Sequence, residues 1–227
     1  MQSSRTPAVR TVVLDLDGTL VDSVPVHVLA WQAAFRDVGL QIPSHRIRSA
    51  IGVGGDRIVE MLAGHAAEES LGDELRERHP QQLDLLFDRI VPTEGAVQLL
   101  TTLKDHGFHL TLASSGERDL TDRLLELLPE TSSLIDNVLT GSDAERSKPD
   151  GELIVRALGG TDPDHAVLIG DAVWDVRAAA DAGIGCIGLL TGGASRDELT
   201  QAGAIDVHET PQTLAEHVAT EGRLPGF

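Results

Sequence analysis

Short apolar runs that alternate with helix-like stretches restrict the fold of this chain more than any other feature of its sequence. The apolar runs end in polar residues or glycine; they cover residues 11–14, 108–113, 138–139, 166–169, 185–190 and, more weakly, 204–207. Apolar residues at helical spacing occur between most of them, over residues 93–106, 120–128, 151–158, 172–182 and 196–202. Strands that alternate with helices predict an α/β fold whose parallel sheet is covered by helices on both faces.

One long segment interrupts this alternation. From residue 23 to residue 90 we find helical patterns, over residues 24–38, 57–62 and 71–90, and no convincing strand. This length is sufficient for a small helical bundle. We therefore expect an α/β core made of residues 1–22 and 91–227, with a helical cap of residues 23–90 inserted into it. An insert at this place would act as a lid over a site near Asp22.

The charge of the chain limits its partners. The formal net charge is −18 over 227 residues, which disfavours binding to nucleic acid or to an anionic membrane surface. No apolar run reaches the length of a membrane-spanning helix, and residues 1–10 lack the apolar stretch of a signal peptide. We expect a cytoplasmic protein that acts on a small molecule. The sequence leaves its oligomeric state open.

Two carboxylates directly follow the first apolar run. Asp15 and Asp17 are separated by one leucine and followed by Gly18 and Thr19. Unpaired carboxylates are costly to bury, but at the end of a strand they can hold a hard cation or take part in chemistry. If the extended conformation persisted, both side chains would point the same way. A polar strand end followed by a turn is the alternative interpretation.

Two further segments carry groups that suit a phosphate. Ser114, Ser115 and Gly116 follow the apolar run 108–113, so a hydroxyl and backbone N–H groups at a helix start can meet a phosphate oxygen there. A plain N-cap serine is the alternative. Lys148 is one of only two lysines in the chain and precedes a proline. It can neutralise an anion or hold a carboxylate, or it can be a solvated loop residue.

A second pair of carboxylates follows the apolar run 166–169. Asp171 comes after a glycine, and Asp175 lies four residues further on, one turn into the next predicted helix. Asp171 can meet Asp15 and Asp17 at the edge of the sheet, where the carboxylates would repel one another unless a cation bound. Ligands that are all oxygen point to Mg²⁺. For Asp175, an acid favoured by the helix N-terminus is the alternative.

These four segments, in this order, resemble the motifs of the haloacid dehalogenase superfamily of phosphotransferases. The matching residues are Asp15 and Asp17 for the first motif, Ser114 for the second, Lys148 for the third, and Asp171 with Asp175 for the fourth. The resemblance covers nearly the whole chain and implies a Rossmann-like parallel sheet. The helical insert resembles the C1 cap of the branch that contains phosphoglycolate phosphatases and β-phosphoglucomutases.

The resemblance also implies a role for each motif residue. Asp15 would be the nucleophile that forms an aspartyl-phosphate, and Asp17 the general acid and then the general base. Ser114 would bind a phosphoryl oxygen, and Lys148 would neutralise charge and orient the nucleophile. Magnesium would be held by the side chains of Asp15 and Asp171 and the backbone carbonyl of Asp17, with Asp175 holding a metal-bound water.

Candidate substrate-binding residues lie in the second motif and in the predicted cap. Ser115 and Gly116 accompany Ser114 in the second motif. His27 occupies a position where relatives often have a histidine that faces the site; a packed or surface histidine is the alternative. The glycine-rich bend at residues 52–57 resembles a cap loop that reaches the substrate, with Gly54 as part of it and Arg57 as a candidate anion contact.

We expect a Mg²⁺-dependent phosphatase that hydrolyses a small phosphorylated metabolite of the phosphoglycolate or sugar-phosphate type. A second aspartate at position 17 argues against a dehalogenase, which lacks it. A β-phosphoglucomutase-like phosphotransferase is the nearest alternative; those enzymes carry a cap lysine, and residues 23–90 contain none. A non-catalytic binding protein on the same scaffold is a second alternative, disfavoured because every motif residue is present.

Overall fold

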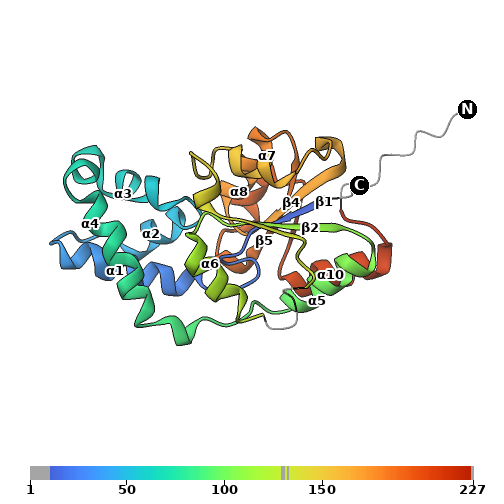
Figure 1. Cartoon of the computed structure of the whole chain (residues 1–227), viewed down its shortest axis with the longest axis horizontal. Helices are drawn as coiled ribbons and strands as arrows, with labels where there is room; N and C mark the ends of the chain where they lie inside the picture. Colours follow the sequence, from blue (N-terminus) through green and yellow to red (C-terminus); the bar gives the residue numbers. More distant parts are fainter. Residues whose placement is uncertain (1–10, 129–130, 132, 226–227) are drawn as a thin grey trace, which may run out of the picture.

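A six-stranded parallel sheet forms the centre of the molecule (Figure 1). The computed structural model describes residues 11–128, 131 and 133–225. In spatial order the strands are β3 (Asn137–Leu139), β2 (His109–Ala113), β1 (Thr11–Leu14), β4 (Ala166–Gly170), β5 (Gly185–Leu189) and β6 (Asp206–His208). The predicted α/β fold is therefore confirmed. Residues 1–10, which were predicted to belong to the core, lie outside the described residues.

Helices cover both faces of this sheet, as Figure 1 shows. Alternate side chains of β1 point to opposite faces: Val12 and Leu14 lie in one apolar cluster and Val13 in the other. The first cluster includes residues of α5 (Ala96–Asp105), α6 (Arg118–Leu125) and α10 (Pro211–Glu221). The second includes residues of α7 (Glu152–Ala157), α8 (Val173–Asp181) and α9 (Arg196–Ala202). The strand β1 is thus buried on both faces, which explains its continuous apolar sequence.

Four helices form a separate group at one end of the molecule (Figure 1). They are α1 (Val24–Asp37), α2 (Ser44–Ala50), α3 (Gly55–Ala63) and α4 (His65–Asp84). This group has its own apolar cluster, which includes Trp31, Phe35, Ile47, Ile58 and Leu75. The boundaries 23–90 of a separate cap domain remain a prediction. Short 3₁₀ helices complete the described elements: η1 (Phe87–Arg89), η2 (Gly141–Asp143), η3 (Pro163–His165) and η4 (Leu190–Gly192).

The register of the central strands brings three loops together. Leu14, the last residue of β1, pairs with Leu112 of β2 on one side and with Ile169 of β4 on the other. The chain leaves β1 toward β2 and β3 and later returns to β4 on the opposite side of β1. Ligands bind at such a switch point, beyond the carboxyl ends of the strands. The fold therefore places the residues that follow β1, β2 and β4 at one edge of the sheet.

Candidate active site

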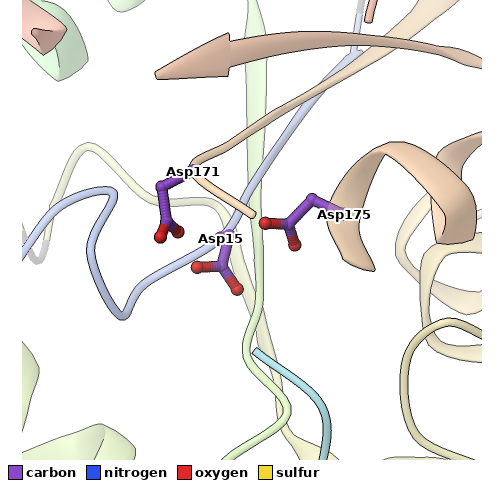
Figure 2. Close-up of side chains that lie close together, drawn as sticks. All are labelled: Asp15, Asp171 and Asp175. Carbon is purple, nitrogen blue, oxygen red and sulfur yellow. The ribbon is translucent and has the colours of Figure 1, made fainter. Parts of the chain in front are cut away.

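Three buried carboxylates meet beyond the ends of β1 and β4 (Figure 2). Asp15 directly follows β1, Asp171 directly follows β4, and Asp175 lies in the first turn of α8. One carboxylate oxygen of each lies within 4.8 Å of those of the other two, and no residue of the three is more than 5% exposed. The structure thus brings Asp15 and Asp171 together at the edge of the sheet, as the sequence predicted.

Small residues and one hydroxyl hold Asp171 in place. The hydroxyl of Thr19 donates to Oδ1 of Asp171 at 3.1 Å and lies 3.4 Å from Oδ2 of Asp15. Gly18 has φ +80° and a Cβ atom there would come within 2.5 Å of Oδ2 of Asp171. A Cβ atom at Gly192 would overlap the same oxygen. Asp171 therefore occupies a space that only glycine leaves open at positions 18 and 192.

Asp175 caps the start of α8, as one of the two interpretations of its sequence position predicted, and also contacts Lys148. Its Oδ2 accepts a hydrogen bond from the backbone N–H of Ala172 at 3.0 Å, so it caps the start of α8. Its Oδ1 lies 2.8 Å from Nζ of Lys148. The acid at this helix N-terminus is therefore also part of the buried charge cluster.

Lys148 lies at the centre of this cluster and has no exposed side-chain surface. Its ammonium group contacts both Asp15 and Asp175. Burial alone would lower the pKa of Lys148, but the two carboxylates outweigh burial and raise it above its ordinary value. The ammonium therefore stays charged, and the interpretation of Lys148 as a solvated loop residue is wrong.

One ammonium does not compensate three carboxylates. Burial raises the pKa of Asp15, and the neighbouring Asp175 and Asp17 raise it further, although Lys148 opposes them. Burial, Asp175 and Asp15 likewise hold the pKa of Asp171 well above its usual range. Binding of a cation would therefore stabilise this cluster, because it would reduce the repulsion between the carboxylates. The donors of the cluster are all carboxylate oxygens, which fits Mg²⁺ better than a softer metal.

Asp17 lies outside this cluster and has different partners. Because β1 ends at Leu14, the strand alternation that predicted a common direction for Asp15 and Asp17 does not continue. The hydroxyl of Ser23 donates to Oδ1 of Asp17, and Nε2 of His27 lies 3.0 Å from the same oxygen. Burial raises the pKa of Asp17, but His27 and Ser23 outweigh it, so the pKa lies below its ordinary value.

Asp17, two histidines and a tryptophan form a chain of contacts that reaches the helices α1 and α4. Nδ1 of His27, on α1, lies 3.1 Å from Nε2 of His79, on α4. The ring of His79 in turn stacks on Trp31, with 4.3 Å between centroids. Burial lowers the pKa of His79 well below its ordinary value, and His27 adds to this. His79 is therefore neutral at pH 7.

Of these groups, Asp15, Asp17, His27, Trp31 and His79 line one cavity of about 590 Å³. The core supplies Asp15, Asp17, Ser115 and Gly116 to its wall, among others. The helices α1, α3 and α4 supply the following lining residues: His27, Trp31, Asp56, Ile58, Glu68, Arg76 and His79. A cavity of this size suits a small metabolite.

Comparison with known proteins decides the family. The family model of the haloacid dehalogenase-like hydrolases matches residues 9–183. The chain belongs to this family of hydrolases. Validoxylamine A 7'-phosphate phosphatase of Streptomyces hygroscopicus subsp. limoneus is 30% identical over 196 residues, which cover 80% of this chain and 86% of that protein.

Two further relatives agree with this assignment. Phosphoglycolate phosphatase of Caulobacter vibrioides is 29% identical over 201 residues, 86% of this chain and 84% of that protein. The crystal structure of a hydrolase from Pseudomonas syringae matches with a TM-score of 0.87 and 34% identity, over 93% of this chain and 98% of that one. The predicted membership of the haloacid dehalogenase family and the predicted hydrolase are confirmed, and the names of these relatives support a phosphatase.

The structure of this haloacid dehalogenase-like hydrolase places the predicted phosphate-binding segment at the cavity. Ser115 and Gly116 line it. Ser114 is 1% exposed, and its Oγ accepts a hydrogen bond from the backbone N–H of Gly116 at 3.1 Å. It is not a helix N-cap, since α6 begins at Arg118 and has Glu117 as its N-cap residue.

Of the three predicted substrate contacts His27, Gly54 and Arg57, only His27 lines the cavity. His27 lines it, whereas Arg57 is not among the lining residues and has its Nε 3.7 Å from Asp56. Successive residues on a helix point about 100° apart, so the neighbour Asp56 faces the cavity instead. Gly54 packs against the side chain of Ser147, where a Cβ atom would overlap it. It therefore lets the cap loop approach the residue before Lys148.

Sequence reasoning missed several residues of the site. Thr19 and Ser23 belong to the first motif region, so their hydroxyls could have been proposed as partners of its aspartates. Arg76 and His79 lie on α4, whose sequence is polar on nearly every side, and no pattern in it marks the face that lines the cavity. None of the helices in the described residues has the length and apolar character needed to cross a membrane.

Proposed function

We propose that this haloacid dehalogenase-like hydrolase is a Mg²⁺-dependent phosphatase that hydrolyses a small phosphorylated metabolite through an aspartyl-phosphate. One observation carries this proposal: Lys148, fully buried, contacts two of three clustered carboxylates at the end of the cavity. Phosphoryl transfer depends mainly on positioning and on compensation of charge. A carboxylate held by a buried ammonium, beside a site for a divalent cation, provides both.

Asp15 would attack the phosphorus atom of the substrate. Its carboxylate oxygen forms a bond to phosphorus while the bond from phosphorus to the leaving alcohol oxygen breaks. Lys148 holds Oδ1 of Asp15, and Thr19 lies near Oδ2, so the carboxylate is held on both sides. In the second step a water molecule attacks the same phosphorus and releases inorganic phosphate and the free carboxylate.

Asp17 would move the protons of both steps. Because its lowered pKa leaves it ionised in the free protein, it would first take up a proton as the substrate binds and then give that proton to the leaving alcohol oxygen. In the second step it would take one from the attacking water. Ser23 and His27 fix the position of its carboxylate. The hydroxyl of Ser114 accepts from the N–H of Gly116, which leaves its own hydrogen free to donate to a phosphoryl oxygen.

Magnesium fits the donor set of the carboxylate cluster. The side chains of Asp15 and Asp171 and the backbone carbonyl of Asp17 would hold it, with Asp175 reaching it through water. When bound, the ion supplies positive charge that lets the anionic substrate approach an anionic nucleophile. The helices α1–α4 would form the cap that closes over the substrate and sets its specificity.

A phosphate-release assay over a panel of small phosphate monoesters, with Mg²⁺ and with EDTA, tests this function. We expect hydrolysis that requires the metal and that is lost in Asp15→Asn. The names of both curated relatives refer to phosphatases of small metabolites, which supports the choice of the panel. Turnover only in the presence of a sugar bisphosphate would indicate a mutase. No turnover of any ester would indicate a non-catalytic binding protein.

A further inference from the structure

Four carboxylates, which lie among apolar residues, form what we call the acidic wall of the cavity. Besides Asp15 and Asp17, the lining residues include Asp56 and Glu68 from the cap helices and Glu117 and Glu145 from the core. These four carboxylates therefore come from both parts of the protein. They line the same cavity as Asp15 and Asp17, into which the leaving group of a bound phosphate ester would extend.

The arginine that lines this cavity is already paired. Nη1 of Arg76 lies 2.7 Å from Glu68 and donates to the carbonyl of Gly55 at 3.3 Å. Nη2 donates to Asp73 at 3.0 Å. Two carboxylates thus compensate its charge.

The two lining histidines do not supply a free cation either. His27 contacts Asp17, so any charge that it carries is compensated there. Burial keeps the pKa of His79 well below its ordinary value, so His79 is neutral. Among the described residues that line the cavity, no charged cationic side chain is left without a carboxylate partner.

Glu68 has a carboxylate oxygen whose capacity to accept a hydrogen bond is unused. Its Oε1 contacts Arg76, but its Oε2 is buried without a hydrogen-bond partner in the described part of the chain. Buried polar atoms are nearly always hydrogen-bonded, and a carboxylate oxygen can only accept. Since Glu68 lines the cavity, its carboxylate is a hydrogen-bond acceptor for a hydroxyl or amino group of a substrate. Phosphate esters of polyhydroxy and amino alcohols carry such donors.

We propose that the substrate is the phosphate ester of an alcohol that bears hydroxyl or amino groups, and that the acidic wall excludes esters with a second anionic group, such as a carboxylate. This inference rests on the proposed phosphatase function and refers to the leaving group alone. The phosphoryl group itself would be met by Lys148 and Mg²⁺ at the opposite end of the cavity.

Three esters of nearly equal size test this proposal. They are 2-phosphoglycolate, which ends in a carboxylate, 2-hydroxyethyl phosphate, which ends in a hydroxyl, and O-phosphoethanolamine, which ends in an ammonium. We expect kcat/KM with Mg²⁺ to be at least about tenfold lower for 2-phosphoglycolate than for the other two, because a like charge is brought close to the wall. Equal rates, or a preference for 2-phosphoglycolate, would overturn the proposal and leave the phosphatase function standing. No hydrolysis of any ester by the intact enzyme would overturn both.

A charge-removing variant separates the effect of the wall from that of folding. Glu68→Gln frees Arg76 from one partner, so kcat/KM should rise for 2-phosphoglycolate and fall for O-phosphoethanolamine. A variant that is merely misfolded would lose both activities. Glu145→Gln, at an exposed lining residue, should shift the ratio of the two rates in the same direction. The matched control is Glu77→Gln, an exposed residue of α4 that is not among the lining residues; it should leave the ratio unchanged. A ratio that changes equally in all three variants would contradict the proposal.

Discussion

The ammonium group of Lys148 contacts the carboxylate of Asp15 in the interior of the protein, where Lys148 has no exposed side-chain surface. Lys148→Met should lower turnover by at least about a thousandfold, because Asp15, the proposed nucleophile, loses the group that orients it. Removal of one partner of a buried ion pair also leaves uncompensated charge, so the free energy of unfolding without metal should fall by about 3 kcal/mol. Phosphate release and urea denaturation in EDTA measure the two effects.

The chain offers a matched control for this prediction, since its other lysine lies on the surface. Lys104 contacts Asp136 at 2.9 Å and its side chain is 27% exposed. Lys104→Met should keep full turnover and lose only about 1 kcal/mol of stability.

In Lys148→Met the crowded carboxylates should also take up Mg²⁺ more readily. A smaller rise in melting temperature on addition of Mg²⁺ than in the wild type would contradict this electrostatic account.

Asp15→Asn should abolish turnover without loss of the fold. Asparagine has nearly the same shape but cannot form the covalent intermediate, so activity should fall by at least about ten thousandfold. The variant leaves Lys148 paired with Asp175, so circular dichroism should show a cooperative melt close to that of the wild type. Asp105→Asn, at an exposed residue at the end of α5, serves as the control and should remain active.

The stability that Asp136 contributes should depend on pH. Partial burial raises the pKa of Asp136, but hydrogen bonds from Lys104 and from the N–H of Leu110 outweigh it, so the pKa in the folded protein is lowered. A lowered pKa means that this stabilisation is present above the unfolded value of 3.8 and is lost as the pH falls through the folded value. Asp136→Asn should therefore cost about 1 kcal/mol at about pH 7, and this cost should shrink progressively as the pH falls below the unfolded value of 3.8. Urea denaturation of both proteins across this range tests the prediction; a difference independent of pH would contradict it.

The sequence was sufficient to predict the sheet and the residues at its edge. Buried parallel strands have continuous apolar sequences, so β1, β2, β4 and β5 were visible directly, with bounds within two residues of those observed. Because parallel strands end at the same edge, Asp15, Ser114 and Asp171 could be brought together without coordinates. Their side-chain partners needed the structure, since strand alternation ends at Leu14.

Elements with few apolar residues were not predicted. The short helix α2 buries only Ile47 and Ala50, which is too little for a periodic pattern. The helix α10 was also missed, although Thr210 caps it and Pro211 is its first residue, a start signal that the sequence does carry. On α4 the polar sequence did not reveal which face lines the cavity. Arg57 was predicted as the cap contact because the bend at residues 52–57 resembles a cap loop that reaches the substrate, whereas Arg76 lines the cavity.

Gly192→Ala should remove the metal site while the fold persists. A methyl group at position 192 would overlap Oδ2 of Asp171, so the carboxylate has to move away from Asp15 and Asp175. The rise in melting temperature on addition of Mg²⁺ should disappear, together with metal-dependent turnover. Gly55→Ala is the matched control, because a Cβ atom there meets no atom closer than 3.8 Å; it should keep the response to Mg²⁺. An undiminished response in Gly192→Ala would show that Asp171 is not a ligand.

A hydrogen bond between α8 and α2 should govern how readily the cap stays closed. Nε1 of Trp174 donates to the backbone carbonyl of Ser49 at 2.9 Å, and the indole ring packs beside Gly52 of the next cap loop. Trp174→Phe keeps most of the ring but loses the donor. The closed arrangement should lose about 1 kcal/mol, so KM for a phosphate ester should rise roughly fivefold while kcat changes little.

Ser49→Ala is the control for this hydrogen bond, because it retains the carbonyl that accepts from Trp174 and should leave KM unchanged. Fluorescence provides a second readout, since Trp31 and Trp174 are the only tryptophans of the chain. With Phe at position 174, the remaining signal comes from Trp31 in the cavity wall, and it should respond to a phosphate ester only at correspondingly higher concentrations. If KM and this fluorescence titration both match those of the wild type, the contact between Trp174 and Ser49 does not hold the cap.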